Sequence, residues 1–258
     1  MALTWVIQNN LSKSGSDDII DACKILGVPY LSISAIPFDP KPPQIEIEGL
    51  AVFYGATNFI NTVHKSGKWK PAVFFDEEKF RISEYMKHWK MLNEAAKITT
   101  LKEFGASSLD PDELFFVRPD KDLKEFAGEV IRFGLFSEWA ERISFGDSLF
   151  DCPIIVAEPV GIADEWRLFV VDGEVVTGSH YRTYGLLTSY ATIPPEVIVF
   201  TEEMTKIWSP ADIFVLDVGK SGKDLYVIEA NCVNSSGFYS SDVTKIVKSI
   251  TEHITKGE

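Results

Sequence analysis

The sequence predicts an α/β (α+β) fold in which a small N-terminal α/β domain precedes a larger block of antiparallel strands. Strands and a helix follow one another in the order β-α-β-β over the first hundred residues, which is typical of a small α/β unit. Two hairpins, 165–182 and 213–231, each join apolar runs through a cluster of turn residues. The apolar content of 45% and the charged content of 24% are those of an ordinary globular protein.

The first hundred residues alternate short apolar runs with polar connections. In 17–27 the apolar residues recur at helical spacing, and Gly27 is a plausible stop. The proline-rich segment 38–44 is a loop. The expected elements, in order, are a strand over 3–8, the helix over 17–27, an extended segment over 28–34, a strand over 49–56, an extended segment over 72–76 and a helical region to about residue 96.

The second block begins with a strand over 113–119 that Pro119 ends. The Asp172-Gly173 pair is a strong signal for the turn of the first hairpin. The polar stretch after Pro119 is expected to be turn-like. The other expected elements are a short helix over 136–144, a buried strand over 152–160, a mainly helical segment over 194–208 and an amphipathic helix over 240–254.

Charge and cysteine usage limit the partners that we expect. The net charge of −13 repels nucleic-acid backbones and anionic membranes, so neither is an expected partner. No apolar run reaches about 18 residues, and the start of the chain resembles a first strand more than a signal peptide. The three cysteines are far apart in the sequence and favour buried thiols in a reducing compartment. We therefore expect a cytoplasmic protein.

Polar residues interrupt the second hairpin at Asp217, Glu229 and Asn231. Glu229 and Asn231 are two apart in a strand and share a face. Asp217 joins that face if the connection has an odd number of residues, such as three, and lies on the other face if it has two. Three oxygen-bearing side chains on one face suit Mg²⁺. The alternative is a half-exposed sheet whose polar face meets water.

A cationic segment follows the apolar strand 113–119. Arg118 ends that strand, and Lys121 and Lys124 come just beyond it. Guanidinium and ammonium groups there could neutralise phosphate oxygens. The alternative is a solvated, charged loop. The segment lacks the GxxxxGK[ST] spacing of a Walker A loop.

The strand 152–160 runs into a bend that exposes backbone groups to which a purine edge could hydrogen-bond. Pro159 lacks an N–H, so Ala157, Glu158 and Val160 are the candidates. Glu165 follows and could accept hydrogen bonds from ribose hydroxyls, and Arg167 lies on the same face of the next strand. The alternative is a salt-bridged pair across a hairpin.

In this order the pieces resemble the ATP-grasp superfamily, which includes glutathione synthetase, D-alanine–D-alanine ligase and the ribosomal-protein glutamate ligases. The order is a cation that closes a strand, a strand that ends in Glu at a bend, a second Glu, strands that carry arginines, and finally Asp, a turn and Glu-x-Asn. The resemblance runs from about residue 98 to the end of the sequence. It implies an N-terminal domain over 1–97 and an ATP-grasp domain over 98–258, divided into a lid subdomain (98–158) and a metal- and substrate-binding subdomain (159–258).

The resemblance also implies a role for each candidate residue. Asp217, Glu229 and Asn231 would be the Mg²⁺ ligands. Arg118 would contact the phosphates of ATP. The remaining roles are the adenine hinge for Glu158 to Val160, a ribose contact for Glu165, and contact with phosphate or the acyl substrate for Arg167 and Arg182.

The sequence departs from the common pattern of the superfamily in the lid and before the metal-binding Asp. Most members have Lys where Arg118 stands, and a glycine-rich lid loop where this chain has a short polar segment. This looks like a divergent branch known from phage and bacterial genomes, in which Lys124 would supply part of the missing contact. An Arg often found two residues before the metal-binding Asp is here Val215. We therefore expect Arg182 to stabilise the oxyanion.

These features predict an ATP- and Mg²⁺-dependent carboxylate–amine (or thiol) ligase that acts through an acyl phosphate and releases ADP and phosphate. Its partners would be ATP, a small-molecule or peptide carboxylate and an amine acceptor. The alternative is an ATP-binding module with reduced catalysis that regulates a protein partner, which the missing glycine-rich loop favours. A third interpretation is a phosphotransferase that uses the same ATP site. The sequence does not specify the oligomeric state.

Overall fold

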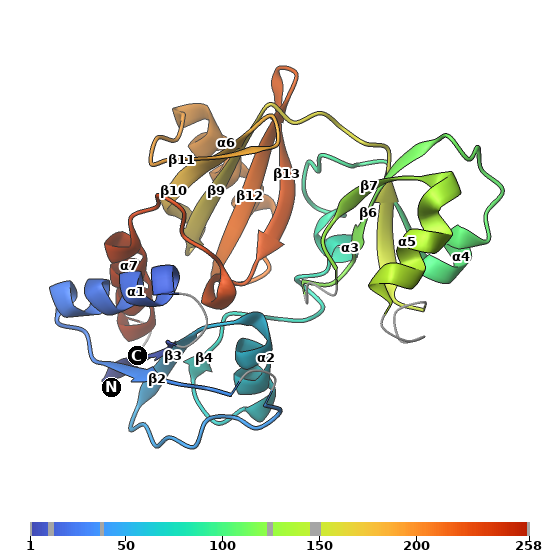
Figure 1. Cartoon of the computed structure of the whole chain (residues 1–258). Helices are drawn as coiled ribbons and strands as arrows, with labels where there is room; N and C mark the ends of the chain where they lie inside the picture. The colour runs from blue at the N-terminus through green and yellow to red at the C-terminus, as the bar shows by residue number, and fades with distance from the viewer. Residues whose placement is uncertain (1, 10–12, 37–38, 123–125, 145–150, 257–258) are drawn as a thin grey trace.

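The computed structural model describes residues 2–9, 13–36, 39–122, 126–144 and 151–256. It contains three sheets that form three lobes, with the two ends of the chain in the same lobe (Figure 1). The mixture of helices and sheets confirms the predicted fold class. No helix in these ranges is long and apolar enough to cross a membrane.

The N-terminal sheet is parallel and has the strand order β2-β1-β3-β4. The short last strand is all that forms in the extended segment predicted over 72–76. The elements of this unit are β1 (Leu3–Gln8), α1 (Lys13–Leu26), β2 (Tyr30–Ile33), β3 (Leu50–Tyr54), α2 (Thr57–Ser66) and β4 (Pro71–Ala72).

The second sheet, which we call the lid sheet, is antiparallel and has the strand order β5-β8-β6-β7. One face packs on short helices through an aromatic-rich core that includes Phe104, Phe136 and Trp139. Its elements are β5 (Lys97–Thr100), α4 (Leu101–Gly105), β6 (Leu114–Pro119), β7 (Glu129–Arg132), the 3-10 turn η1 (Phe133–Leu135), α5 (Phe136–Ile143) and β8 (Pro153–Ala157).

The third sheet, the large sheet, has the order β11-β10-β9-β12-β13 and is antiparallel throughout. Asp172 and Gly173 both have positive φ, 53° and 80°, which confirms the predicted turn between β9 and β10. The elements are β9 (Asp164–Val171), β10 (Glu174–Thr183), β11 (Leu186–Tyr190), α6 (Pro195–Ile207), β12 (Ile213–Ser221), β13 (Asp224–Asn231), the 3-10 turn η3 (Val233–Ser235) and α7 (Val243–Lys256).

The two faces of the large sheet have different neighbours. Alternate side chains of β9 and β12, such as Phe169 and Val215, join one core with α1, α7 and the N-terminal sheet. The intervening side chains, such as Leu168 and Leu216, join a second core with α6 and the segment around Trp89. The first face is therefore the one that meets the N-terminal unit, and its remaining part carries the polar residues of the candidate site.

Two regions differ from the sequence prediction. The segment after residue 76 is mostly turns around one short helix, α3 (Ile82–Tyr85), and the polar stretch expected to be turn-like forms β7. The lid sheet begins at Lys97, close to the predicted domain boundary, and the connection between the last residue of β8 and the first of β9 carries the chain from the lid sheet to the large sheet (Figure 1). The division at 97/98 and 158/159 stays a prediction.

Candidate functional site

Strand pairing aligns three of the predicted site residues across the large sheet. Asp217 on β12 pairs with Arg167 on β9 and with Glu229 on β13. Asn231 lies two residues beyond Glu229 on the same strand. The register therefore gathers the predicted metal ligands and one predicted catalytic arginine at one place on the sheet.

A β-bulge, and not the turn, places Asp217 on the face of Glu229. The connection has two residues, because Ser221 pairs with Asp224 across Gly222-Lys223. Such a connection was expected to put Asp217 on the opposite face. The register shifts between Asp217 and Val218, since Val218 pairs with Val227 whereas Asp217 pairs with Glu229. The extra residue, Ile228, restores the shared face.

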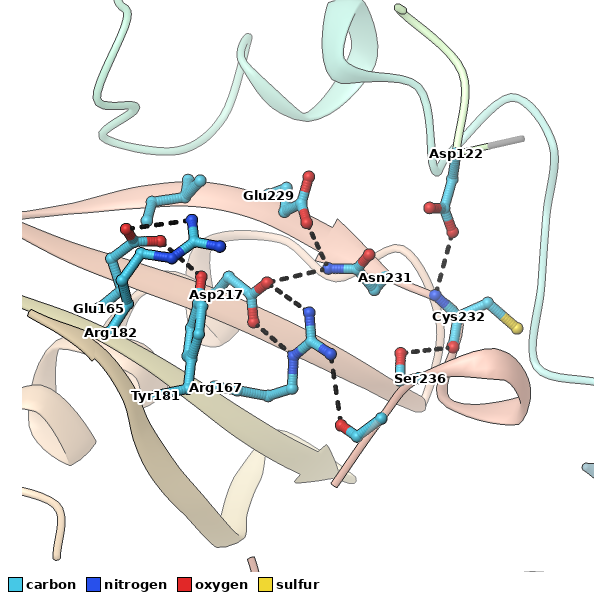
Figure 2. A network of polar contacts seen from close by, with 12 residues as sticks. Asp122, Glu165, Arg167, Tyr181, Arg182, Asp217, Glu229, Asn231, Cys232 and Ser236 are labelled. Carbon is cyan, nitrogen blue, oxygen red and sulfur yellow. Dashed lines mark hydrogen bonds and ion pairs between the residues drawn. The ribbon is translucent and has the colours of Figure 1, made fainter. Parts of the chain in front are cut away.

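Two arginines neutralise the two carboxylates. The Nε and Nη2 atoms of Arg167 donate to Oδ1 and Oδ2 of Asp217 at 2.9 Å and 2.7 Å, and both side chains are buried (Figure 2). Arg118, on β6 of the lid sheet, reaches across to β13, where it contacts the Glu229 carboxylate and donates from Nη1 to the Ile228 carbonyl at 3.4 Å. The predicted phosphate ligand thus binds a predicted metal ligand and links the two sheets.

Asn231 lies between the two carboxylates. Its Nδ2 atom is 3.3 Å from Oδ2 of Asp217 and 3.1 Å from Oε1 of Glu229 (Figure 2). The oxygen and nitrogen of such an amide are assigned from their neighbours, and rotation of the amide presents the oxygen instead. Within the described part of the chain, no group of three or more His, Cys, Asp or Glu side chains could hold a metal ion. Two carboxylates with one amide oxygen are nevertheless a donor set that fits Mg²⁺.

The electrostatic surroundings keep Glu229 ionised. Burial on its own raises the pKa of this carboxyl group, but the charge of Arg118 and the hydrogen bond from Asn231 outweigh that effect. The result is a pKa lowered from 4.5 to about 2. Glu229 is therefore a carboxylate at neutral pH, as a metal ligand has to be.

A second pair of predicted residues adjoins the first. Oε2 of Glu165 accepts a hydrogen bond from the Tyr181 hydroxyl at 2.7 Å, and Oε1 lies 3.5 Å from Nη1 of Arg182 (Figure 2). Glu165 is buried, whereas the Arg182 side chain is 42% exposed. This is the pair across a hairpin that the sequence left open as an alternative, and it leaves most of the Arg182 guanidinium available.

The predicted hinge residues lie apart from this network, where the chain passes from the lid sheet to the large sheet. Ala157 is buried at the end of β8, and Val160 is exposed. The carbonyl oxygen of Glu158 accepts a hydrogen bond from Asn93 at 3.3 Å. The predicted phosphate contact Lys124 lies outside the described residues.

A cavity of about 360 Å³ opens between the lid sheet and β13. One part of its wall is apolar and includes Phe80, Tyr85 and Phe126. The other part carries charge from Arg118 and Glu229, together with Lys121 and Asp122. The cavity therefore places apolar surface beside the ion pair that joins the two sheets.

Comparison with known sequences decides the family. Residues 42–252 match a family of ATP-grasp domains, described as family 3 of its clade. The chain belongs to this family. No curated protein matches the sequence.

Solved structures share the ATP-grasp fold at low sequence identity. The D-cycloserine synthetase DcsG aligns with a TM-score of 0.65 and 12% identity over 97% of this chain and 99% of that one. The D-alanine–D-alanine ligase from Bacillus anthracis aligns with a TM-score of 0.64 and 10% identity over 100% and 98%. A Chryseobacterium gregarium RiPP-associated ATP-grasp ligase, in complex with ADP and a leader and core peptide, aligns with a TM-score of 0.59 and 12% identity over 100% and 98%. These likenesses confirm the predicted superfamily and fold.

Sequence reasoning missed Tyr181 and Tyr239 in this ATP-grasp site. Their rings stack at 4.8 Å, and the Arg167 guanidinium lies 5.7 Å from one ring and 5.2 Å from the other. Tyr181 is the extra residue where the β9–β10 pairing shifts between His180 and Arg182. A tyrosine between His and Arg in an exposed-looking hairpin gave no signal of this role, since only the bulge turns the ring toward Glu165 and Arg167.

Proposed function

We propose that this chain is an ATP- and Mg²⁺-dependent ligase that joins a carboxylate to an amine, or to a thiol, through an acyl phosphate. The observation that supports this most is the cluster of Arg118, Arg167, Asp217, Glu229 and Asn231. It combines two cations, two carboxylates and an amide at the edge of a cavity between two sheets. Such a cluster suits the binding of a metal and a polyphosphate.

The chain's residues would bind and orient the nucleotide. Arg118 would exchange Glu229 for the phosphate oxygens, because a guanidinium binds phosphate as well as carboxylate. The bend after Ala157, with Glu158 and Val160, would hold the adenine edge, and Glu165 would accept hydrogen bonds from the ribose. Lys124 would supply a further contact to phosphate.

Asp217, Glu229 and Asn231 would hold Mg²⁺. When bound, the ion would neutralise charge on the transferring phosphoryl group and fix its orientation. Arg167 would keep the Asp217 carboxylate in place through its paired hydrogen bonds. That makes Arg167 a positioning residue, since its guanidinium contacts Asp217 and not open space.

The proposed chemistry needs no protein nucleophile. An oxygen of the substrate carboxylate would attack the γ-phosphorus of ATP, and ADP would leave. The amine nitrogen would then attack the acyl carbon, phosphate would leave, and the nitrogen would lose a proton. Arg182 would stabilise the oxyanion of the second step, because its guanidinium is partly exposed beside Glu165. The D-alanine–D-alanine ligase and the peptide-bound ligase of the same fold support a small-molecule or peptide carboxylate as the acyl donor.

Trapping of the acyl intermediate tests this proposal. The protein would be incubated with Mg-ATP, fractionated metabolite and peptide pools, and hydroxylamine as the amine. A ligase of this kind should form a hydroxamate that depends on ATP and on one pool. Tight binding of ATP without a hydroxamate from any pool would favour a binding module that has lost catalysis.

A further inference from the structure

A second cavity, of about 450 Å³, lies between the N-terminal unit and the loop that follows β13. Residues from both regions form its wall. These are Gln8, Gly15, Ser16, Asp18, Tyr54, Gly55 and Ala56 from the N-terminal unit, and Ser235, Gly237, Phe238 and Tyr239 from the loop.

The topology of the N-terminal sheet makes this a place where ligands bind. In the order β2-β1-β3-β4, the chain leaves β1 toward one edge of the sheet and β3 toward the other. Gln8 is the last residue of β1 and Tyr54 is the last residue of β3. In open parallel sheets, ligands bind in the crevice beyond the carboxyl ends of two such strands.

The cavity adjoins the carboxylate cluster through Arg167. The Nη1 atom of Arg167 donates to the Gly237 carbonyl at 3.3 Å, and its guanidinium lies 5.2 Å from the ring centre of Tyr239. Both of these residues line the cavity, and the same guanidinium holds Asp217. A molecule in the cavity would therefore be separated from the proposed phosphoryl site by one side chain.

The charge of the wall favours a cation. Of the described residues that line the cavity, Asp18 alone is charged. The backbone N–H groups of Gly55 and Ala56 already donate to Asn234 O at 3.0 Å and to Oε1 of Gln8 at 2.9 Å, so they are not available to a carboxylate. Burial, together with the nearby Asp17 and Asp21, raises the pKa of Asp18, and a bound cation would offset that cost.

Gln8 adds a neutral donor. Its side chain is buried, with 3% of the residue exposed, and it uses Oε1 to accept from Ala56. The Nε2 atom has no hydrogen-bond partner among the described residues, although the residue lines the cavity. Buried amide groups of this kind ordinarily have partners, so the amide can donate to a carbonyl oxygen of a ligand.

We propose that this cavity binds the amine co-substrate, and that this co-substrate is a compact primary amine with a neutral carbonyl beside it. Asp18 accepts from the ammonium group, Gln8 donates to the carbonyl, and the rings of Tyr54, Phe238 and Tyr239 enclose the remainder. The assignment of this molecule as the acceptor rests on the proposed ligase function. Its binding does not, because the cavity is present without nucleotide.

The test uses two opposed sets of probes in the absence of ATP. Amino-acid amides carry an amine and a carbonyl but no carboxylate, whereas N-acetyl amino acids carry a carboxylate but no amine. At least one amide should raise the melting temperature of the whole chain, and calorimetric titration should then give its affinity. Asp18→Asn should weaken that affinity by about tenfold or more, since it removes a hydrogen bond to a charged group.

Asp17→Asn is the matched control, because Asp17 is an exposed neighbour on α1 that does not line the cavity. It should leave amide binding unchanged. Binding of N-acetyl amino acids that strengthens in Asp18→Asn would overturn the proposal, and so would an affinity for amides that Asp18→Asn leaves intact or a panel in which no amide binds. A titration with Mg-ATP separates the two proposals, since loss of nucleotide binding contradicts the ligase function and leaves the cation site standing.

Discussion

Arg118→Ala should affect ATP and adenosine differently. In the structure its guanidinium contacts the Glu229 carboxylate and the Ile228 carbonyl, and its side chain is 19% exposed. If it exchanges these partners for phosphate oxygens, its removal costs ATP one hydrogen bond between charged groups, which is worth about 1.5–3 kcal/mol. The affinity for Mg-ATP should therefore fall about ten- to a hundredfold, while the affinity for adenosine stays the same.

The same substitution should act in the opposite direction on metal alone. Arg118 occupies the Glu229 carboxylate in the structure, so a divalent cation without nucleotide has to compete with it. Arg118→Ala should therefore tighten the binding of Mn²⁺, measured by electron paramagnetic resonance, while it weakens the binding of Mg-ATP, measured by calorimetry. Arg132→Ala is a control, because Arg132 is an exposed cation on β7 of the same lid sheet. Equal losses for ATP and adenosine would refute the reasoning and make Arg118 structural.

Three further predictions concern groups of known surroundings. Glu229→Gln should fold, as judged by circular dichroism, and lose Mg²⁺-dependent nucleotide binding in calorimetry, since it keeps the size of the side chain and removes its charge; unchanged affinity would exclude Glu229 from the site. Because the pKa of Glu229 is lowered from 4.5 to about 2 in the fold, its ionisation stabilises the protein above about pH 4.5, and this contribution, about 2–4 kcal/mol, should be lost as the pH falls toward 2. Urea unfolding between pH 6 and pH 3 should therefore show a smaller loss of stability in Glu229→Gln than in the natural protein, and equal losses would contradict the assignment. Cys152 should react with a thiol reagent before Cys23, since Cys23 is fully buried with a pKa raised to about 11; mass spectrometry of the labelled peptides decides the order.

Local patterns in the sequence predicted the elements that have strong local signals. The Asp172-Gly173 pair located the β9–β10 turn because its two positive φ angles suit those residue types. Helix α2 has no such signal, since its N-cap residue, Ala56, makes no side-chain cap. Strand β7 was missed because only Ile131 of its four residues is buried.

The candidate site was predictable where spacing decides it and not where tertiary contacts do. Glu229 and Asn231 share a face because they are two apart in one strand. The position of Asp217 depends on a bulge at Ile228, which no turn residue announces. The contact between Arg118 and Glu229 joins two sheets across more than a hundred residues of chain, so only the assembled fold brings these residues together.

The nucleotide product tests the central claim most directly. The protein would be incubated with ATP, Mg²⁺ and fractionated metabolite or peptide pools, and the nucleotides would be separated by chromatography. An acyl-phosphate ligase should release ADP and phosphate slowly with ATP alone and faster with the right carboxylate and amine, and Glu229→Gln should remain at background. AMP and pyrophosphate as the main products would contradict the account, because Asp217, Glu229, Asn231 and Arg118 are expected to act on the terminal phosphate.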